Sequence, residues 1–115
     1  MEITYEDKKV EALFEDFNLM AKTKDKVLTK LIKKRYDQLK AAETFEDYLQ
    51  TNLGKPHLLK GNKAGCYGIS VNDHIRLIIK PKLKDSSTES LKICTQITLK
   101  GVEDYHGNKI TSYIP

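Results

Sequence analysis

The hydrophobic period changes once along this 115-residue chain, near residue 58, and this change constrains the fold more than any other feature. Before it, apolar residues recur every three or four positions, which is the spacing of one helix face. After it, apolar and polar residues alternate, which is the spacing of a strand with one buried face. We therefore expect one α+β domain over residues 1–115, with the helices packed on one face of a mainly antiparallel sheet.

The helical half predicts two to three helices after a short first strand. Ile3 and Tyr5 alternate with polar neighbours, and Asp7 is placed to cap the helix that follows. The predicted helices cover about residues 8–21, 27–39 and a short stretch after Thr44. Gly54 and Pro56 are expected to end the last of them.

Alternation in the second half predicts a β-hairpin and one further strand. The predicted strands cover residues 67–71, 75–79 and 93–99. Asn72 and Asp73 form the expected hairpin turn, and residues 82–90 are expected to be an exposed loop. With the N-terminal strand, this gives a sheet of four to five strands whose face away from the helices is open.

Positive charge is concentrated in the strand half of the chain. Residues 1–50 hold ten Lys/Arg against eleven Asp/Glu, whereas residues 51–115 hold ten against five. Between residues 55 and 84, seven basic residues face only Asp73. Such a patch suits a polyanion. The alternative is that these lysines protect the edges of strands from pairing with other chains.

The cysteines and the hydropathy favour a cytoplasmic protein without a membrane segment. Cys66 and Cys94 lie in strand-like segments and lack a Cys-x-x-Cys partner, so we expect reduced, structural thiols. No apolar run approaches the ~20 residues that span a bilayer, and the first residues do not resemble a secretory leader.

Several catalytic classes lack their motif in this chain. No His-x-x-x-His or Cys-x-x-Cys spacing supports a zinc site, and neither a phosphate-binding glycine loop nor a Gly-x-Ser-x-Gly elbow is present. We therefore expect no metal and no cofactor. His74 is interpreted as a surface or packing residue of a strand. The remaining acid/base groups and cations are His57, Asp104, Tyr105, His106, Lys60 and Arg76.

This set matches the needs of RNA cleavage without a metal. In that reaction a base takes the proton of the 2′-hydroxyl, the 2′-oxygen attacks the adjacent phosphorus, and an acid protonates the departing 5′-oxygen. The planar guanidinium of Arg76 suits two oxygens of the pentavalent phosphorus. The required 2′-hydroxyl restricts the substrate to RNA. The structural alternatives are a strand-end cluster at residues 104–106 and an ion pair of Arg76 with Asp73 or Asp104.

Two motifs resemble HigB-type killer proteins of the RelE/ParE toxin superfamily. Residues 57–61 read His-Leu-Leu-Lys-Gly, and a basic turn, a glycine, an alternating strand and Arg76 follow them. About 30 residues further on, residues 103–106 read Glu-Asp-Tyr-His and resemble the closing Asp-Tyr-His of the family. The two motifs occur in the family's order, and with the helical N-terminus the resemblance covers nearly the whole chain.

The resemblance implies a RelE-like microbial ribonuclease fold and cleavage of mRNA in the A site of the 70S ribosome. It implies acid/base roles for His57 and His106, positioning or proton-handling roles for Asp104 and Tyr105, and phosphate contacts from Lys60 and Arg76. The lysines expected to bind the substrate around this set are Lys55, Lys63 and Lys80. A HigA-type helix-turn-helix antitoxin is the implied partner, and operator DNA is contacted only through it.

The chain departs from the family pattern in two places. The hairpin turn carries Asn72 and Asp73 where the family often has a further basic residue, and residues 107–115 extend past the usual terminal histidine. The first difference weakens the expected phosphate affinity, and the second could shield or reposition His106. Two alternative functions stay open: a ParE-like gyrase inhibitor that cuts nothing, and an inactive corepressor that only binds an antitoxin.

Overall fold

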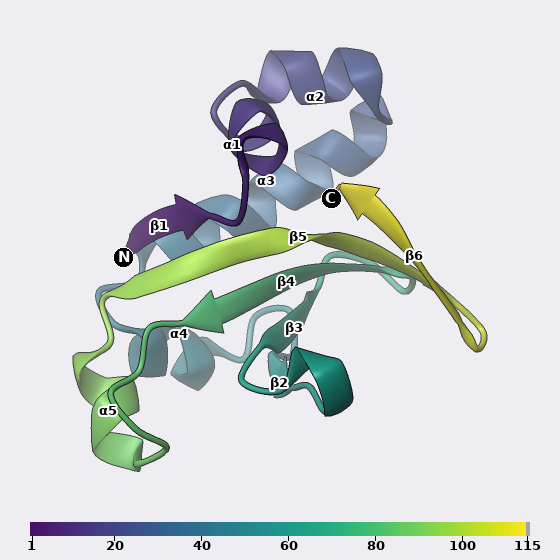
Figure 1. The fold of residues 1–115 in the computed structure, drawn as a ribbon. Coiled ribbons are helices and arrows are strands. Elements are labelled where there is room, and N and C mark those ends of the chain that lie inside the picture. Colours follow the sequence, from purple (N-terminus) through teal and green to yellow (C-terminus); the bar gives the residue numbers. More distant parts are fainter. Residues whose placement is uncertain (115) are drawn as a thin grey trace.

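A computed structural model describes residues 1–114, which form a six-stranded sheet with helices packed on one face (Figure 1). The elements are β1 (Glu2–Tyr5), α1 (Lys8–Phe14), α2 (Phe17–Thr23), α3 (Lys26–Ala41), α4 (Phe45–Thr51), β2 (His57–Leu58), the 3₁₀ turn η1 (Gly61–Lys63), β3 (Tyr67–Ser70), β4 (Ile75–Pro81), α5 (Thr88–Ile93), β5 (Gln96–His106) and β6 (Lys109–Ile114). None of the helices in residues 1–114 combines the length and apolar character needed to cross a bilayer.

The strand order is β1-β5-β4-β3-β2, and β6 also pairs with β5. One edge of the long strand β5 pairs with two different strands. β1 runs parallel to its first part, over residues 96–99, and β6 runs antiparallel to its second part, over residues 102–106. The α+β class is confirmed, and the sheet is one strand larger than the largest sheet expected, because residues 109–114 form β6.

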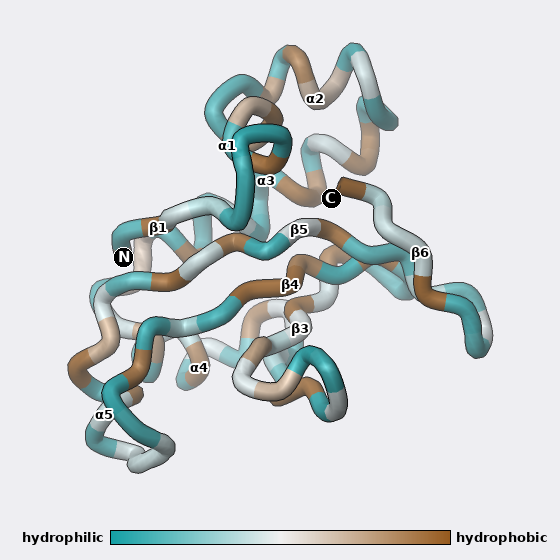
Figure 2. The backbone as a smooth tube through the Cα atoms, in the orientation of Figure 1, coloured by the Kyte–Doolittle hydropathy of each residue, from teal (hydrophilic) through white to brown (hydrophobic). Residues whose placement is uncertain are grey.

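One hydrophobic core joins helices α1–α4 to the sheet. Figure 2 shows hydrophobic and hydrophilic residues alternating along β5, which leaves one face of this strand for the core. The fully buried residues of the sheet include Ile69, Leu77, Ile79, Ile97 and Leu99, and those of the helices include Val10, Met20, Ile32, Leu39 and Phe45. Arg76 and Lys80 alternate with the core residues of β4 and therefore lie on the opposite, open face.

The prediction of a single helix over residues 8–21 is wrong, because this segment forms the two helices α1 and α2. Asp16 stands between them with a non-helical backbone, and its carboxylate accepts a hydrogen bond from the Leu19 backbone N–H at 3.1 Å. An aspartate that caps a new helix in this way competes with continuation of the previous one. The apolar spacing is the same on both sides of the break, so periodicity alone did not reveal it.

The segment before β5 also differs from the expectation. Residues 88–93 form helix α5 instead of a loop running into a strand, and β5 begins only at Gln96. The Ser87 hydroxyl caps this helix, and Asp85 accepts hydrogen bonds from the Ser87 backbone N–H at 2.8 Å and the Ser90 hydroxyl at 2.7 Å. Hydrogen bonds from Ser87 and then Ser90 lower the pKa of Asp85 to about 2.

Both cysteines are free and buried, as expected for structural thiols, but neither lies in a strand. Cys94 follows the last residue of α5, and Cys66 precedes β3. Helix α4 begins after Thr44, as predicted, and ends at Thr51. Asn52 follows it in the left-handed conformation, so the helix ends before Gly54 and Pro56 are reached.

Candidate active site

The candidate active site lies on the open face, where β2, β3, β4 and β5 bring distant residues together. Arg76 of β4 stands opposite Ser70 of β3 on one side and Glu103 of β5 on the other. His57 of β2 stands opposite Gly68 of β3. A Cβ atom at Gly68 would lie 3.1 Å from His57 Cε1, so the missing side chain leaves room for the imidazole. The pairing of β2 with β3 and of β3 with β4 thus brings His57 next to Arg76, which is 19 residues away in the sequence.

Arg76 is held between two other residues of the predicted site. Its Nη1 lies 3.3 Å from His57 Nε2, and its guanidinium carbon lies 4.3 Å from the centroid of the Tyr105 ring. His57 Nδ1 lies 3.3 Å from the Lys55 carbonyl oxygen. A neutral imidazole with its proton on Nδ1 satisfies both contacts, because Nδ1–H then donates to Lys55 and Nε2 accepts from Arg76. His57 Nε2 is then the basic nitrogen and faces the guanidinium.

Glu103 extends the contacts to the 3₁₀ turn. The Tyr105 hydroxyl donates a hydrogen bond to Glu103 Oε1 at 3.2 Å, and Lys63 Nζ forms an ion pair with the same oxygen at 2.9 Å. Burial, and then the Glu103 charge, raise the pKa of Tyr105, so the phenol stays protonated at neutral pH. The hydrogen bond from Lys63 to Glu103 raises the pKa of this lysine as well. The sequence had not placed Glu103 among the site residues.

A β-bulge in β5 determines which of residues 103–106 lie on the open face of the sheet. The pairing passes from Ile79 opposite Leu99 to Ile78 opposite Gly101, so Lys100 is an extra residue in β5. An extra residue shifts the alternation by one position. Glu103 and Tyr105 therefore share the open face with Arg76, whereas the two residues that alternate with them, Asp104 and His106, point to the other side of the strand.

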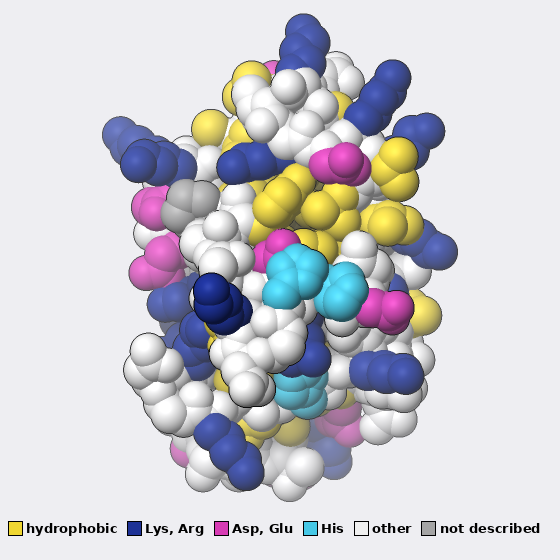
Figure 3. Space-filling view, turned by 90° about the vertical axis from the view of Figure 1, so that its right-hand side faces the viewer, with side chains coloured by type: hydrophobic (Ala, Val, Ile, Leu, Met, Phe, Trp, Pro, Cys, Tyr) yellow, Lys and Arg dark blue, Asp and Glu magenta, His cyan; other side chains and the backbone are white. Residues whose placement is uncertain are grey.

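Asp104 and His106 form a second group with His74. His106 Nε2 lies 3.0 Å from Asp104 Oδ1, a contact that lacks hydrogen-bond geometry, and that buried oxygen has no hydrogen bond within residues 1–114. The rings of His74 and His106 lie 4.7 Å apart, and His74 Nδ1 is 3.2 Å from the Tyr105 carbonyl oxygen. Figure 3 shows histidine side chains gathered on one face of the molecule, among basic side chains. The group of Asp104, His106 and His74 therefore lies next to the group of Arg76, His57 and Tyr105 at the end of β5.

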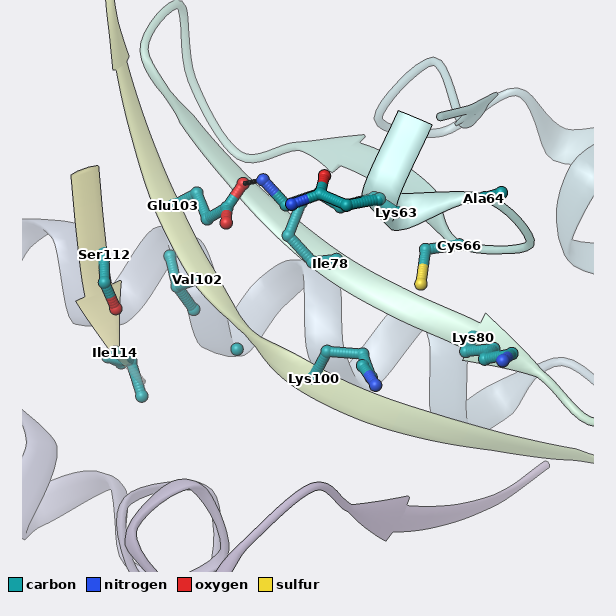
Figure 4. Close-up of a pocket in the computed structure, with 12 residues that line it drawn as sticks. Lys63, Ala64, Cys66, Ile78, Lys80, Lys100, Val102, Glu103, Ser112 and Ile114 are labelled. Atoms are coloured by element: carbon teal, nitrogen blue, oxygen red, sulfur yellow. Dashed lines mark ion pairs between the residues drawn. The ribbon is translucent and has the colours of Figure 1, made fainter. Parts of the chain in front are cut away.

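The remaining predicted lysines surround the site without contacting Arg76. Lys55 and Lys60 are exposed on the segments that flank β2. Lys63 and Lys80 line a hollow of about 310 Å³ in the open face, together with Cys66 and Lys100 (Figure 4). Lys63 is paired with Glu103 there, and the Lys100 ammonium lies 2.6 Å from a Glu6 carboxylate oxygen. The hollow therefore carries less net charge than its lysines suggest.

The structure thus unites His57, Arg76 and Tyr105, and adds Glu103 and Lys63 to them. It does not bring His106 or Asp104 into contact with Arg76. Arg76 contacts an imidazole and a phenol ring, and within residues 1–114 it forms no ion pair with Asp73 or Asp104. No three or more His, Cys, Asp and Glu side chains of these residues are arranged to hold a metal ion.

The fold of this chain is similar to that of toxins in solved structures. No protein-family model matches the sequence, and no curated protein matches it. Among solved structures, the YoeB-YefM complex and the heterotetrameric YoeB-YefM toxin-antitoxin complex, both from Staphylococcus aureus, match at 23% and 24% identity, each with a TM-score of 0.53. Each match covers 92% of this chain and 97% of the other.

A third similar structure is the YoeB/ParE toxin from Agrobacterium tumefaciens. It is 15% identical, has a TM-score of 0.53, and the match covers 92% of this chain and 99% of the toxin. At these identities the likeness establishes a shared fold over nearly the whole chain. The expectation of a RelE-like fold is therefore confirmed in the form of the YoeB-like toxin architecture.

Proposed function

We propose that this chain is the toxin of a type II toxin-antitoxin system, of the HigB type, and cleaves mRNA in the ribosomal A site without a metal. The contact of Arg76 with both His57 and Tyr105 carries this proposal, because it joins a base, a phosphate ligand and a proton donor on one open surface. The toxin fold of the solved structures supports the proposed class.

Each group has a role in the proposed reaction. His57 Nε2 takes the proton of the 2′-hydroxyl, and the 2′-oxygen bonds to phosphorus as the bond to the 5′-oxygen breaks. Arg76 binds the phosphate oxygens, which gain negative charge in the transition state. Tyr105 protonates the departing 5′-oxygen, and its raised pKa means that the phenol carries its proton at neutral pH. The products are a 2′,3′-cyclic phosphate and a 5′-hydroxyl.

Asp104 and His106 are second candidates for proton transfer, as the resemblance implies. The His106 side chain is 64% exposed, and its ring stands beside His74 at the same end of β5 as Tyr105. Lys55, Lys60 and Lys80 surround the site as cations for the flanking phosphates of the message.

The proposed partner is a HigA-type helix-turn-helix antitoxin. Two of the similar structures are toxin-antitoxin complexes, in which the toxin YoeB is bound to YefM. We propose that the antitoxin of this chain neutralises it in a complex of this kind, and that operator DNA is contacted only through the antitoxin. The proposed site of action is the cytoplasm, where ribosomes translate.

Inducing the chain in a bacterial host tests the proposed function. We expect growth arrest with new 5′ ends inside a translated reporter message, mapped by primer extension. His57→Ala should lower the cleavage rate about 10²-fold, because the base is lost while the phosphate ligand stays. Lys33→Ala on α3, whose ammonium forms an exposed pair with Asp37, is the control and should cleave normally. Arrest with intact message and blocked DNA replication would instead support gyrase inhibition.

A further inference from the structure

Ile78 and Cys66 are buried outside the hydrophobic core. They are 4% and 5% exposed, yet neither belongs to the cluster that joins the helices to the sheet. Ile78 alternates with Arg76 along β4 and therefore lies on the open face. Ile78 and Cys66 both line the hollow of about 310 Å³, a volume within the range of pockets that bind small molecules. The open face therefore has an apolar floor beside its phosphate ligand.

The rim of the hollow offers a hydrogen-bond acceptor. Glu103 Oε1 is occupied by Lys63 at 2.9 Å and by the Tyr105 hydroxyl at 3.2 Å. Glu103 Oε2 accepts no hydrogen bond within residues 1–114, where Asp104 Oδ1 is the only buried side-chain oxygen or nitrogen without a partner. Oε2 is therefore in contact with solvent and can accept a hydrogen bond from a ligand.

The charges of the hollow do not suit an anion alone. Lys63 and Lys100 are each paired with a carboxylate, which leaves Lys80 as the one lining lysine without an ion pair within residues 1–114. The Glu103 carboxylate on the rim repels a phosphate that lies over the floor. An apolar floor with an acceptor at its edge suits a flat molecule that donates hydrogen bonds from its rim, and a nucleobase has this form.

We propose that the hollow binds the base of a nucleotide next to the scissile phosphate, and that Glu103 Oε2 selects bases that carry an amino group. This inference rests on the proposed ribonuclease function. Ile78 lies two residues from Arg76 on the same face, about 7 Å along β4, so the base can lie on Ile78 while its phosphate contacts Arg76. Lys80, two residues further along the same face, can contact the next phosphate. Figure 4 shows Ile78 between Glu103 and Lys80.

The carboxylate discriminates between bases by the groups on their edges. Adenine, cytosine and guanine each present an amino group, which donates to a carboxylate oxygen. Uracil presents two carbonyl oxygens, which the carboxylate repels, and its N–H lies between them. Messages with uracil at this position should therefore be cleaved more slowly. A glutamine amide both donates and accepts, so it accommodates uracil as well.

Single-turnover cleavage on ribosomes tests the proposal, with messages that differ only in the nucleotide on one side of the mapped cut. For one of the two sides, the unaltered protein should cleave the amino-base messages about tenfold faster than the uracil message. Glu103→Gln should narrow this ratio to about threefold or less, because the amide also accepts uracil. The ratio is taken within one protein, so an effect of the substitution on the chemical step cancels. Glu89→Gln, which alters the exposed pair with Lys92 on α5, is the matched control and should keep the full ratio.

Free mononucleotides separate this proposal from the ribonuclease function. In an NMR titration of the unaltered chain, cytidine 3′-monophosphate should shift the Ile78 methyl signals at lower concentration than uridine 3′-monophosphate. If this holds and the chain cuts no RNA, the ribonuclease function fails while the base site is supported. Ile78 signals that respond equally to both nucleotides, or to neither, would overturn the proposal. So would a preference against uracil that Glu103→Gln retains in full, or the absence of any such preference in the unaltered protein.

Discussion

Replacing Arg76 by alanine is expected to reduce message cleavage at least about 10³-fold and to abolish growth arrest. The guanidinium has three tasks in the proposed mechanism: it binds the phosphate, it contacts His57 Nε2, and it packs against the Tyr105 ring. Alanine removes all three, whereas loss of His57 removes only the base. The Arg76 side chain is part of the open face and not of the hydrophobic core, so the fold and antitoxin binding should be retained.

Arg76→Lys separates charge from geometry in this prediction. Lysine keeps the positive charge but cannot bind two phosphate oxygens in a plane or lie flat on a phenol ring, so most of the activity should still be lost. Cleavage of a message on ribosomes measures the activity of each variant. Co-purification with the antitoxin shows whether the fold and antitoxin binding are retained. Wild-type cleavage by Arg76→Ala would show that the cluster is not the active site.

Gly54→Ala is expected to destabilise the domain by about 3 kcal/mol. Gly54 has a φ of 74°, and its carbonyl accepts a hydrogen bond from the Ser70 backbone N–H at 2.7 Å. A Cβ atom there would lie 2.5 Å from Ile69 Cγ2 in the core and 3.0 Å from Arg35 Nε. Both the left-handed backbone and the overlap with β3 disfavour alanine. Urea unfolding should show a clearly lower midpoint.

Gly61→Ala is the matched control for this change. Gly61 has a φ of 71°, but a Cβ atom there would have no neighbour within 4 Å among residues 1–114, so only the backbone penalty of about 1 kcal/mol applies. The difference between the two variants then measures the overlap with Ile69. Equal unfolding midpoints for the two would contradict the close packing of this loop on β3.

Periodicity was sufficient to predict the α+β class and the longer elements of this chain, but not the sixth strand β6. The apolar stripes of α3 and the alternation in β3 and β4 each extend over enough residues to be recognised, and Thr44 and Asp7 cap the helices that they were expected to cap. It was insufficient where short-range hydrogen bonds override the pattern. Asp16 divides the first helix in this way, and Ser87 with Asp85 stabilises a short helix in a polar segment.

The candidate site was predictable in composition but not in arrangement. His57 and Arg76 follow from their motif, and the hairpin register brings them together. The bulge at Lys100 has no clear signal in the sequence beyond the following Gly101, yet it sends Tyr105 to the open face and His106 to the other. Continuous alternation from Ile97 and Leu99 would have placed Tyr105 in the core. For the same reason Glu103 was not recognised as a contact of Tyr105.

Cleavage of a message with a single 2′-deoxynucleotide at the mapped cut site tests the central claim most directly. The mechanism requires the 2′-oxygen as nucleophile, so this message should stay intact on toxin-treated ribosomes. The all-ribose message should yield fragments that end in a 2′,3′-cyclic phosphate. Cleavage of the deoxy-substituted message at the same position would contradict catalysis by the His57, Arg76 and Tyr105 cluster.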